Sequence, residues 1–403
     1  MLAMLTHQAV LSRLAGLLLV SSSLVAAGCD DRAESAASCG DGRVDPSEEC
    51  DEGELNGSPG RCESDCSAPR FASVEGDVLA FMTEVRGPRI EGAKVSVFER
   101  PELSVVTGAD AHFRFDGLQV GRDVTLVVEH PDFKTTQTAT LRLGPNGIRP
   151  FSVQLVPKGI FTALSTLVPL PLDEAEHCVI ATTAARMGGS LYVYLRQGAP
   201  GTSVVLEPAA PAESGPIYFD ESVLPNADQP ATSTDGGVLF YRVPPGYYTM
   251  RASRERTLFD EVRFACRAGM IVNAGPPLGL LANVPNPDHG LGALRAPDAY
   301  SASTDALCEA TQACVNEEAG ATYYPEATLA SCKAMFANTW AWLEEGCARS
   351  SGLDEAAKGF YDCRAAGPCS VTLGGDEVCV AEERAFGEAE LVYGDCLLAS
   401  LPD

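Results

Sequence analysis

The sequence is poor in basic residues and has no recognisable catalytic motif. Only 29 lysines and arginines stand against 55 aspartates and glutamates, so the 403 residues carry a formal net charge of −26. Nucleic acid is therefore not an expected partner, because binding to phosphates needs clustered basic side chains. No G-x-S-x-G elbow, H-E-x-x-H helix, P-loop or G-x-G-x-x-G loop occurs. We therefore expect a protein that is not an enzyme.

Zinc ligands are also scarce. No Cys-x-x-Cys pair occurs, and the five histidines do not stand at zinc-ligand spacing. Fifteen cysteines are nevertheless present, and this number is typical of disulfides formed in an oxidising compartment. The sequence therefore predicts an exported protein without a firm metal site.

The N-terminus indicates export and a lipid anchor. An apolar stretch too short to span a membrane leads into the small residues that precede Cys29, as in a cleaved signal peptide over residues 1–28. A cysteine after small residues resembles a bacterial lipobox, although Ala26 stands where that motif usually has leucine. This resemblance implies that an acylated Cys29 anchors the protein to the membrane, at the bacterial outer membrane or cell surface. The alternative is an ordinary secreted protein in which Cys29 pairs with another cysteine.

The other fourteen cysteines form three groups with even numbers of members. We expect all disulfides to lie within these groups, including Cys178–Cys266. The pairing among the eight cysteines of the last group cannot be read from the sequence. The groups have four, two and eight members: Cys39, Cys50, Cys62 and Cys66; Cys178 and Cys266; and Cys308, Cys314, Cys332, Cys347, Cys363, Cys369, Cys379 and Cys396.

Residues 29–38 form a polar tether, and residues 39–70 follow as a small cysteine-rich segment. The run Glu48-Glu49-Cys50-Asp51 with Cys39-Gly40 before it resembles the myxobacterial cysteine-rich repeat. So short a segment cannot bury a real core, so two disulfides must hold it together.

The same segment is a candidate calcium site. Residues 39–66 contain nine acidic and two basic side chains, and crowded carboxylates are relieved when a divalent cation takes their oxygens as ligands. Asp45, Glu49 and Asp51 are the candidate ligands, and calcium is the one structural cofactor considered. The alternative is that these side chains point into water.

Residues 71–158 predict a small antiparallel β-sandwich. Short runs of β-branched and alternating residues are separated by glycine, proline and aspartate. The pieces Val74–Val78, Gly92–Val95, Thr107–Asp110 and Phe113–Leu118 resemble a carboxypeptidase regulatory-like domain, which has a transthyretin-like fold. The resemblance implies a module without catalytic residues of its own.

Residues 159–283 predict a second, divergent sandwich. The run Thr234–Thr249 resembles a hairpin of the same superfamily, and Leu191–Leu195 alternates as a strand does. Tyr192, Tyr194 and Tyr241 are candidates for a sugar-stacking face. The alternative is that these rings are half-buried sheet residues.

Residues 284–300 read as a linker, and residues 301–403 change to a helical pattern. Apolar residues and cysteines recur at steps of three and four, which predicts helices over 304–318, 329–347, 354–365 and 379–396. Cysteines on the apolar faces indicate a disulfide-linked α-helical bundle.

The expected fold class is therefore multidomain and mainly β, with two antiparallel sandwiches, a disulfide knot and a C-terminal helical bundle. The leading functional hypothesis is a non-catalytic, lipid-anchored surface protein that displays its sandwiches for adhesion or recognition, with an unknown protein or glycan partner. The alternatives are a carbohydrate-binding surface protein and, less favoured, a peptidase-associated or hydrolase component.

Overall fold

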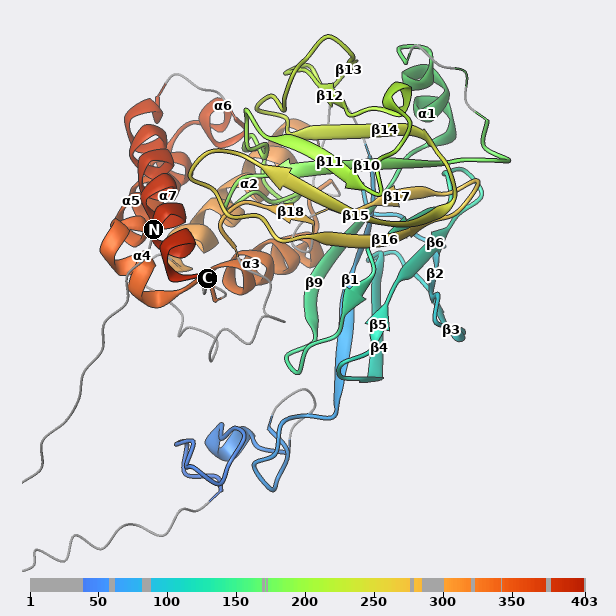
Figure 1. Ribbon diagram of the computed structural model, residues 1–403. Coiled ribbons are helices and arrows are strands. Elements are labelled where there is room, and N and C mark those ends of the chain that lie inside the picture. Colours follow the sequence, from blue (N-terminus) through green and yellow to red (C-terminus); the bar gives the residue numbers. More distant parts are fainter. Residues whose placement is uncertain are drawn as a thin grey trace, which may run out of the picture.

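The computed structural model describes residues 39–57, 62–81, 88–168, 171, 173–275, 279–284, 301–319, 323–341, 343–374 and 378–401. The signal peptide, the tether with Cys29 and residues 285–300 of the linker lie outside the described residues. The described protein is a mixed α/β structure, rich in β-strands, with a helical region at its C-terminal end (Figure 1).

The cysteine-rich segment lies apart from the sheets, at the lower end of β1 in Figure 1. It has little regular structure beyond one 3-10 helix, η1 (Gly53–Leu55). Two disulfides, Cys39–Cys66 and Cys50–Cys62, hold it together.

Nine strands form the first β-region, in which β1 is the central strand of a three-stranded sheet. β1 pairs antiparallel with β4 and parallel with β9. The strands are β1 (Phe71–Ala80), β2 (Lys94–Val97), β3 (Arg100–Val106), β4 (His112–Gln119), β5 (Asp123–Val124), β6 (Leu126–Glu129), β7 (Thr136–Thr138), β8 (Leu141–Arg142) and β9 (Ile148–Leu155).

The second β-region follows after a short helix. Its strands β11, β15 and β16 form an antiparallel sheet of their own. The elements are α1 (Lys158–Ser165), β10 (Cys178–Ala185), β11 (Ser203–Glu207), η2 (Ala212–Ser214), β12 (Ile217–Phe219), β13 (Pro225–Asn226), β14 (Gly237–Val243), β15 (Gly246–Ser253), β16 (Val262–Cys266), β17 (Ile271–Asn273) and β18 (Leu280–Leu281).

One long sheet crosses both β-regions, which differs from the two separate antiparallel sandwiches expected. Its strands run in the order β13-β12-β14-β10-β17-β7-β6-β2-β3, with β18 also paired to β10. The join is the parallel pair β17 and β7, in which Ile271 lies opposite Thr136. A strand edge left unpaired exposes a row of backbone donors and acceptors, and this pairing satisfies both edges. The two regions consequently share one hydrophobic core.

Residues 191–195 do not form the expected strand. They lie in a turn and bend between β10 and β11, and Tyr192 and Val193 are buried there. These side chains pack in a second core with residues of the helical region. The alternation therefore reflects burial of a loop rather than a strand in a sheet.

The C-terminal region has four long helices and two short ones. The expected helix over 329–347 is divided, because Glu344 accepts hydrogen bonds from the backbone N–H groups of Gly346 and Cys347 and so caps a new helix. The helices are α2 (Ser301–Ala319), α3 (Glu326–Ala341), α4 (Glu345–Ser351), α5 (Leu353–Ala366), α6 (Cys369–Thr372) and α7 (Val380–Ser400).

Five of the seven disulfides lie in the main body. Cys178–Cys266 joins β10 to β16. The other four connect the helices: Cys308–Cys332, Cys314–Cys369, Cys347–Cys396 and Cys363–Cys379. Among the described residues, no helix has the length and apolar character needed to cross a membrane.

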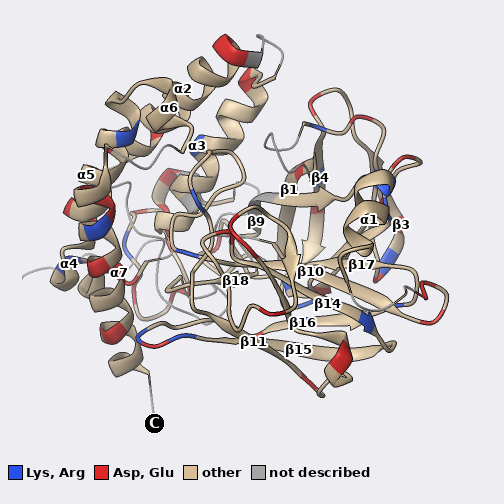
Figure 2. Ribbon diagram, turned by 90° about the horizontal axis from the view of Figure 1, so that it is seen from above, with Lys and Arg blue, Asp and Glu red and all other residues tan. Residues whose placement is uncertain are grey.

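Acidic residues are distributed over the helices, the loops and the sheet edges rather than gathered in one place (Figure 2). A high net charge spread in this way favours solubility.

Candidate functional site

A cavity of about 340 Å³ lies between α1 and one face of the long sheet. Phe161, Leu164 and Ser165 of α1 line it at the i, i+3, i+4 spacing of one helix face, and Val168 lines it just after the helix ends. The volume falls within the range of small-molecule sites. A more open hollow of about 480 Å³ lies beside Lys94, His130 and Lys134, and the cavity under α1 is the more enclosed of the two.

The floor of the cavity is built from alternate residues of the central strands. Val179, Ala181 and Thr183 of β10 face the cavity, because successive side chains of a strand point to opposite faces. Leu239 of β14 lies opposite Ala181, and Ile271 of β17 lies opposite Val179. The neighbouring strands β14, β10 and β17 therefore place their side chains next to one another on the floor of the cavity.

The space persists because α1 does not pack tightly on the sheet. No residue of α1 is fully buried, although Phe161 contacts an apolar cluster that includes Val179 and Ile271. A helix of eight residues is marginal in isolation, so α1 depends on what lies beneath it. An apolar ligand in the cavity would supply that missing packing.

Polar groups line the opposite end of the cavity. Arg196 donates a hydrogen bond to the hydroxyl of Thr234, with 3.3 Å between the atoms, and Asp235 accepts one of 3.0 Å from the N–H of Gly237. Tyr241 of β14 lines the other end of the cavity, in the same apolar cluster as Val179 and Ile271, and burial raises the pKa of its phenol. A phenol held more firmly protonated is suited to donating a hydrogen bond rather than to acting as a base.

The three candidate glycan-stacking tyrosines do not form one face. Tyr194 and Tyr241 line the cavity, although Tyr241 is only 2% exposed. Tyr192 is also 2% exposed and is absent from the cavity lining. The exposed tyrosine of the sheets is Tyr247, at 84%. The sheets of the described chain therefore do not present the planar row of exposed rings expected for stacking on a polysaccharide.

Tyr192 belongs instead to a buried polar cluster at the junction of the β-regions with α3. Its hydroxyl donates a hydrogen bond of 2.6 Å to Asp77 of β1 and accepts one of 2.9 Å from Ser152 of β9. Arg89 pairs with Asp77 at 3.0 Å and donates a hydrogen bond of 2.6 Å to Thr328 of α3. These residues bind one another, so the cluster holds the regions together.

Two of the three candidate calcium ligands, Glu49 and Asp51, accept hydrogen bonds within the cysteine-rich segment itself. Asp51 accepts hydrogen bonds from the backbone N–H groups of Gly40, Gly42 and Gly53 and from the side chain of Asn56, at 2.8 to 3.0 Å. Burial would raise the pKa of Asp51, but these hydrogen bonds lower it to about 2. Because a carboxylate has about four acceptor sites, Asp51 has none left for an ion.

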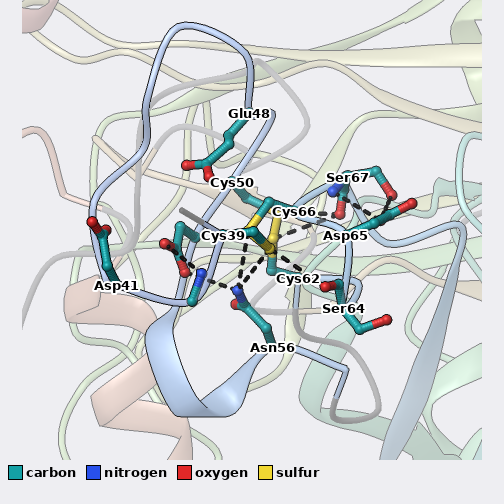
Figure 3. Close-up of a disulfide and its surroundings, with 12 residues drawn as sticks. Cys39, Asp41, Glu48, Cys50, Asn56, Cys62, Ser64, Asp65, Cys66 and Ser67 are labelled. Atoms are coloured by element: carbon teal, nitrogen blue, oxygen red, sulfur yellow. Dashed lines mark hydrogen bonds between the residues drawn. A yellow bond between two sulfur atoms is a disulfide. The ribbon is translucent and has the colours of Figure 1, made fainter. Parts of the chain in front are cut away.

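The other two candidates do not join Asp51 around a common point. Glu49 accepts a hydrogen bond of 2.7 Å from the N–H of Ala68. Among the described residues, the ligand atoms of Asp45, Glu49 and Asp51 do not converge. Figure 3 shows the carboxylates of Asp41, Glu48 and Asp65 spread around the paired cysteines. Backbone amides occupy Asp51 and Glu49, the three carboxylates lie apart in the described segment, and the calcium site stays a prediction.

One group of potential metal ligands does come together in the described chain, formed by Cys39, Glu48 and Cys66. The two cysteines are bonded to each other, and a disulfide sulfur is not a thiolate ligand. This group is consequently part of the disulfide knot rather than a metal centre.

Sequence reasoning missed both the cavity and the Asp77 cluster. The cavity depends on how far α1 stands from the sheet, and no residue pattern encodes that distance. Asp77 did leave a signal, since it is a charged residue just before the apolar run Val78-Leu79-Ala80 that ends the strand Phe71–Ala80. A carboxylate in such a position needs a buried partner.

Comparisons with known proteins are sparse. No family model matches the sequence, and no curated protein does. The named resemblances to the cysteine-rich repeat and to the regulatory-like domain therefore stay predictions.

Solved structures give faint likenesses to β-rich surface proteins. The TIE protein of Bacillus anthracis is similar over 50% of this chain, which spans 34% of that protein's length, with 12% identity and a TM-score of 0.16. The minor pilin GBS52 of Streptococcus agalactiae is similar over 56% of this chain and 99% of that one, with 10% identity and a TM-score of 0.18. The shaft pilin SpaA of Lactobacillus rhamnosus GG is similar over 51% of this chain and 98% of that one, with 8% identity and a TM-score of 0.17. Such scores define neither a shared fold nor a shared function.

Proposed function

We propose that the protein is a non-catalytic recognition protein, held at the bacterial surface by a lipid on Cys29, and that it binds its ligand between α1 and the long sheet. The observation that carries the proposal is the cavity of about 340 Å³ beneath a helix that has no buried residue. Protein interiors are normally close-packed, so a space of this size with polar groups at one end supports a binding site.

The disulfides support the exported location. Fourteen of the fifteen cysteines are paired in seven bonds, and such bonds persist in oxidising compartments. The remaining cysteine is Cys29, to which the lipobox resemblance assigns the lipid. The count fits a lipid anchor better than the alternative in which Cys29 pairs with another cysteine.

The placement of the perturbed buried carboxylates supports binding rather than catalysis. Burial would raise the pKa of Asp77, but the hydrogen bond from His112 and the charge of Arg89 lower it. Burial raises the pKa of Glu390, which is paired with Arg186 at 3.2 Å. Active sites usually gather such groups at a cleft, whereas these carboxylates are bound to arginines away from the cavity lining.

A carbohydrate ligand is the second candidate, and two tyrosines favour it. Tyr194 and Tyr241 both line the cavity, and an aromatic ring beside hydrogen-bonding groups is a usual arrangement for holding a sugar. Any sugar would enter the cavity rather than lie on an open sheet face, because Tyr192 is held by Asp77.

Native mass spectrometry of the form beginning at Asp30 tests the proposal. The protein is incubated with fractions of envelope lipids, glycans and small metabolites, and we expect a bound mass that Ala181→Trp abolishes, because the indole fills the cavity. Ala265→Trp is the matched control, since Ala265 is a partly exposed strand residue outside the cavity lining. The absence of any bound mass, or turnover of the bound compound, would contradict the proposal.

The anchor has its own test. Cys29→Ser in the full chain removes the atom that accepts the lipid, so the protein should leave the membrane fraction or remain unprocessed. Cys29 has no partner among the seven disulfides, so the body should be unaffected. A variant that still partitions with the membrane like the parent would overturn the lipid anchor.

A further inference from the structure

The floor of the cavity along β10 is apolar at one end, apart from the hydroxyl of Tyr241, and polar at the other. At one end Ile271 lies opposite Val179, and Ile271 donates its N–H to the carbonyl of Thr135. The ammonium group of the neighbouring Lys134 lies 5.0 Å from the centre of the Phe161 ring. These contacts place Phe161 of α1 above the Val179 end of the strand.

The polar end lies four residues further along the same strand. Thr183 is opposite Gly237, whose N–H is bound by Asp235. The loop that carries Arg196 reaches this point, because the N–H of Gly198 donates to the carbonyl of Thr234 at 2.9 Å. A ligand lying along β10 therefore meets apolar side chains at one end and hydrogen-bonding groups at the other.

The charges at the cavity disfavour an anionic head group. Arg196 is accompanied by Asp235 and Glu221 in the lining, and the whole chain carries a net charge of −26. Arg196 already donates to Thr234. An added carboxylate would meet two fixed negative charges and one cation, whereas hydroxyl or amide groups would find both donors and acceptors.

The dimensions set the length of the apolar part. Val179 and Thr183 are about 13 Å apart at the usual rise of a strand, which is roughly the length of an extended chain of ten carbon atoms. The volume of about 340 Å³ equals on the order of ten water molecules. A single chain of medium length with a small head fits this space.

We propose that the cavity binds an uncharged amphipathic molecule, with its hydrocarbon chain under α1 and its hydroxyl or amide head at Thr183, Arg196 and Asp235. This inference rests on the proposed function, because it specifies the ligand of the same cavity. Burial of the chain supplies most of the affinity, and the polar end fixes the orientation. The chain also fills the space that leaves α1 without a buried residue.

Calorimetry with the form beginning at Asp30 tests the inference, using 1-octanoylglycerol and 1-decanoylglycerol below their aggregation concentrations. Each added methylene should tighten binding about three- to fourfold, because it moves apolar surface out of water. Decanoate should bind several-fold more weakly than 1-decanoylglycerol. Ala181→Trp should abolish binding and Ala265→Trp should leave it unchanged. Phe161→Ala, a milder change on the outer helix, should reduce the gain per methylene.

The outcomes separate the ligand class from the cavity itself. Equal or tighter binding of decanoate would overturn the uncharged head. Binding of cellobiose that Ala181→Trp abolishes, without binding of either glycerol ester, would overturn the amphipathic ligand and leave the recognition cavity intact. If no probe binds while native mass spectrometry finds a bound mass that depends on Ala181, the inference fails and the proposed function stands. If neither experiment finds a ligand, both fail.

Discussion

The hydroxyl of Tyr192 donates a hydrogen bond of 2.6 Å to the carboxylate of Asp77, 115 residues earlier in the chain. Asp77 is 1% exposed and also pairs with the guanidinium group of Arg89 at 3.0 Å. Arg89 in turn donates hydrogen bonds to Thr328 and Ser331 of α3. One carboxylate therefore connects both β-regions to the helical region.

Asp77→Asn should lower the free energy of unfolding by on the order of 3–5 kcal/mol, because breaking a buried ion pair leaves the remaining charge uncompensated. The side chain of Arg89 is only 7% exposed, so water cannot replace the lost carboxylate. Guanidinium-induced unfolding followed by circular dichroism measures the change. Tyr192→Phe is the control, and it should cost about 1–3 kcal/mol because it leaves one acceptor unsatisfied. If the asparagine variant is the more stable of the two, the carboxylate is not the centre of the junction.

Stability should also depend on pH through His112. Its Nδ1 lies 3.1 Å from Asp77, and this hydrogen bond, aided by the charges of Asp77, Glu75 and Asp110, raises the pKa of His112. When folding raises the pKa of a histidine, its protonated form stabilises the folded state fully at a pH below the unfolded pKa of about 6.5. This stabilisation is lost as the pH rises through the pKa of the folded state. The pKa of Asp77 is lowered, so its contribution is lost as pH falls instead.

The measurement is the free energy of unfolding at a series of pH values. The parent should lose stability as pH rises from about 6 to 8, and His112→Gln should flatten this part of the curve. His130→Gln is the control, because His130 is remote from Asp77 in the pairing of the strands and contacts Phe133 instead. Equal slopes for the parent and the His112 variant would show that the Asp77–His112 contact does not contribute in this window.

The sequence predicted local features well where each depends on near neighbours. The grouping of the cysteines predicted pairing within groups, and the structure has this pairing, including Cys178–Cys266. The periodicity after residue 301 predicted helices, since a helix face is a property of residues three and four apart. The break at Glu344 was missed, although a glutamate before Gly346 and Cys347 is a capping position that inspection could have found.

Long-range pairing could not be predicted in the same way. The parallel pair β7 and β17 joins residues more than a hundred positions apart, and nothing in Thr136–Thr138 specifies which edge will meet it. The same limit applies to the site. Tyr192, Tyr194 and Tyr241 look equivalent in the sequence, but a loop carries Tyr192 to Asp77 and leaves the other two at the cavity.

The disulfide Cys178–Cys266 should be the more stabilising of two bonds in the main body. It closes a loop of 88 residues, whereas Cys363–Cys379 closes one of 16. A longer closed loop restricts the unfolded chain more. Replacing Cys178 and Cys266 by alanine should therefore lower the free energy of unfolding by roughly 4–5 kcal/mol, and replacing Cys363 and Cys379 should lower it by roughly 3 kcal/mol. Unfolding by guanidinium without a reductant gives both values. A larger loss for the shorter loop would mean that local packing, rather than chain entropy, determines the contribution.

Gly188 is a glycine at which alanine should strongly disturb the contact between the β-regions and the helices. Its φ is +72°, and a Cβ atom there would lie 2.2 Å from the hydroxyl of Tyr361 and 3.4 Å from the Trp340 ring. Gly201 is a matched control, because its φ is +79° and a Cβ atom would meet nothing within 4 Å. Both alanine variants bear the left-handed strain of about 1–2 kcal/mol.

Gly188→Ala should lower the free energy of unfolding by roughly a further 1–3 kcal/mol. Tyr361 is fully buried and cannot move away without displacing its neighbours. Comparison of the two variants by chemical unfolding separates crowding from backbone strain. The near-ultraviolet circular dichroism of Gly188→Ala should also change, since Tyr361 and Trp340 contact each other with ring centres 6.0 Å apart. Equal losses of stability with unchanged aromatic signals would show that the turn at Gly188 does not press on the helical core.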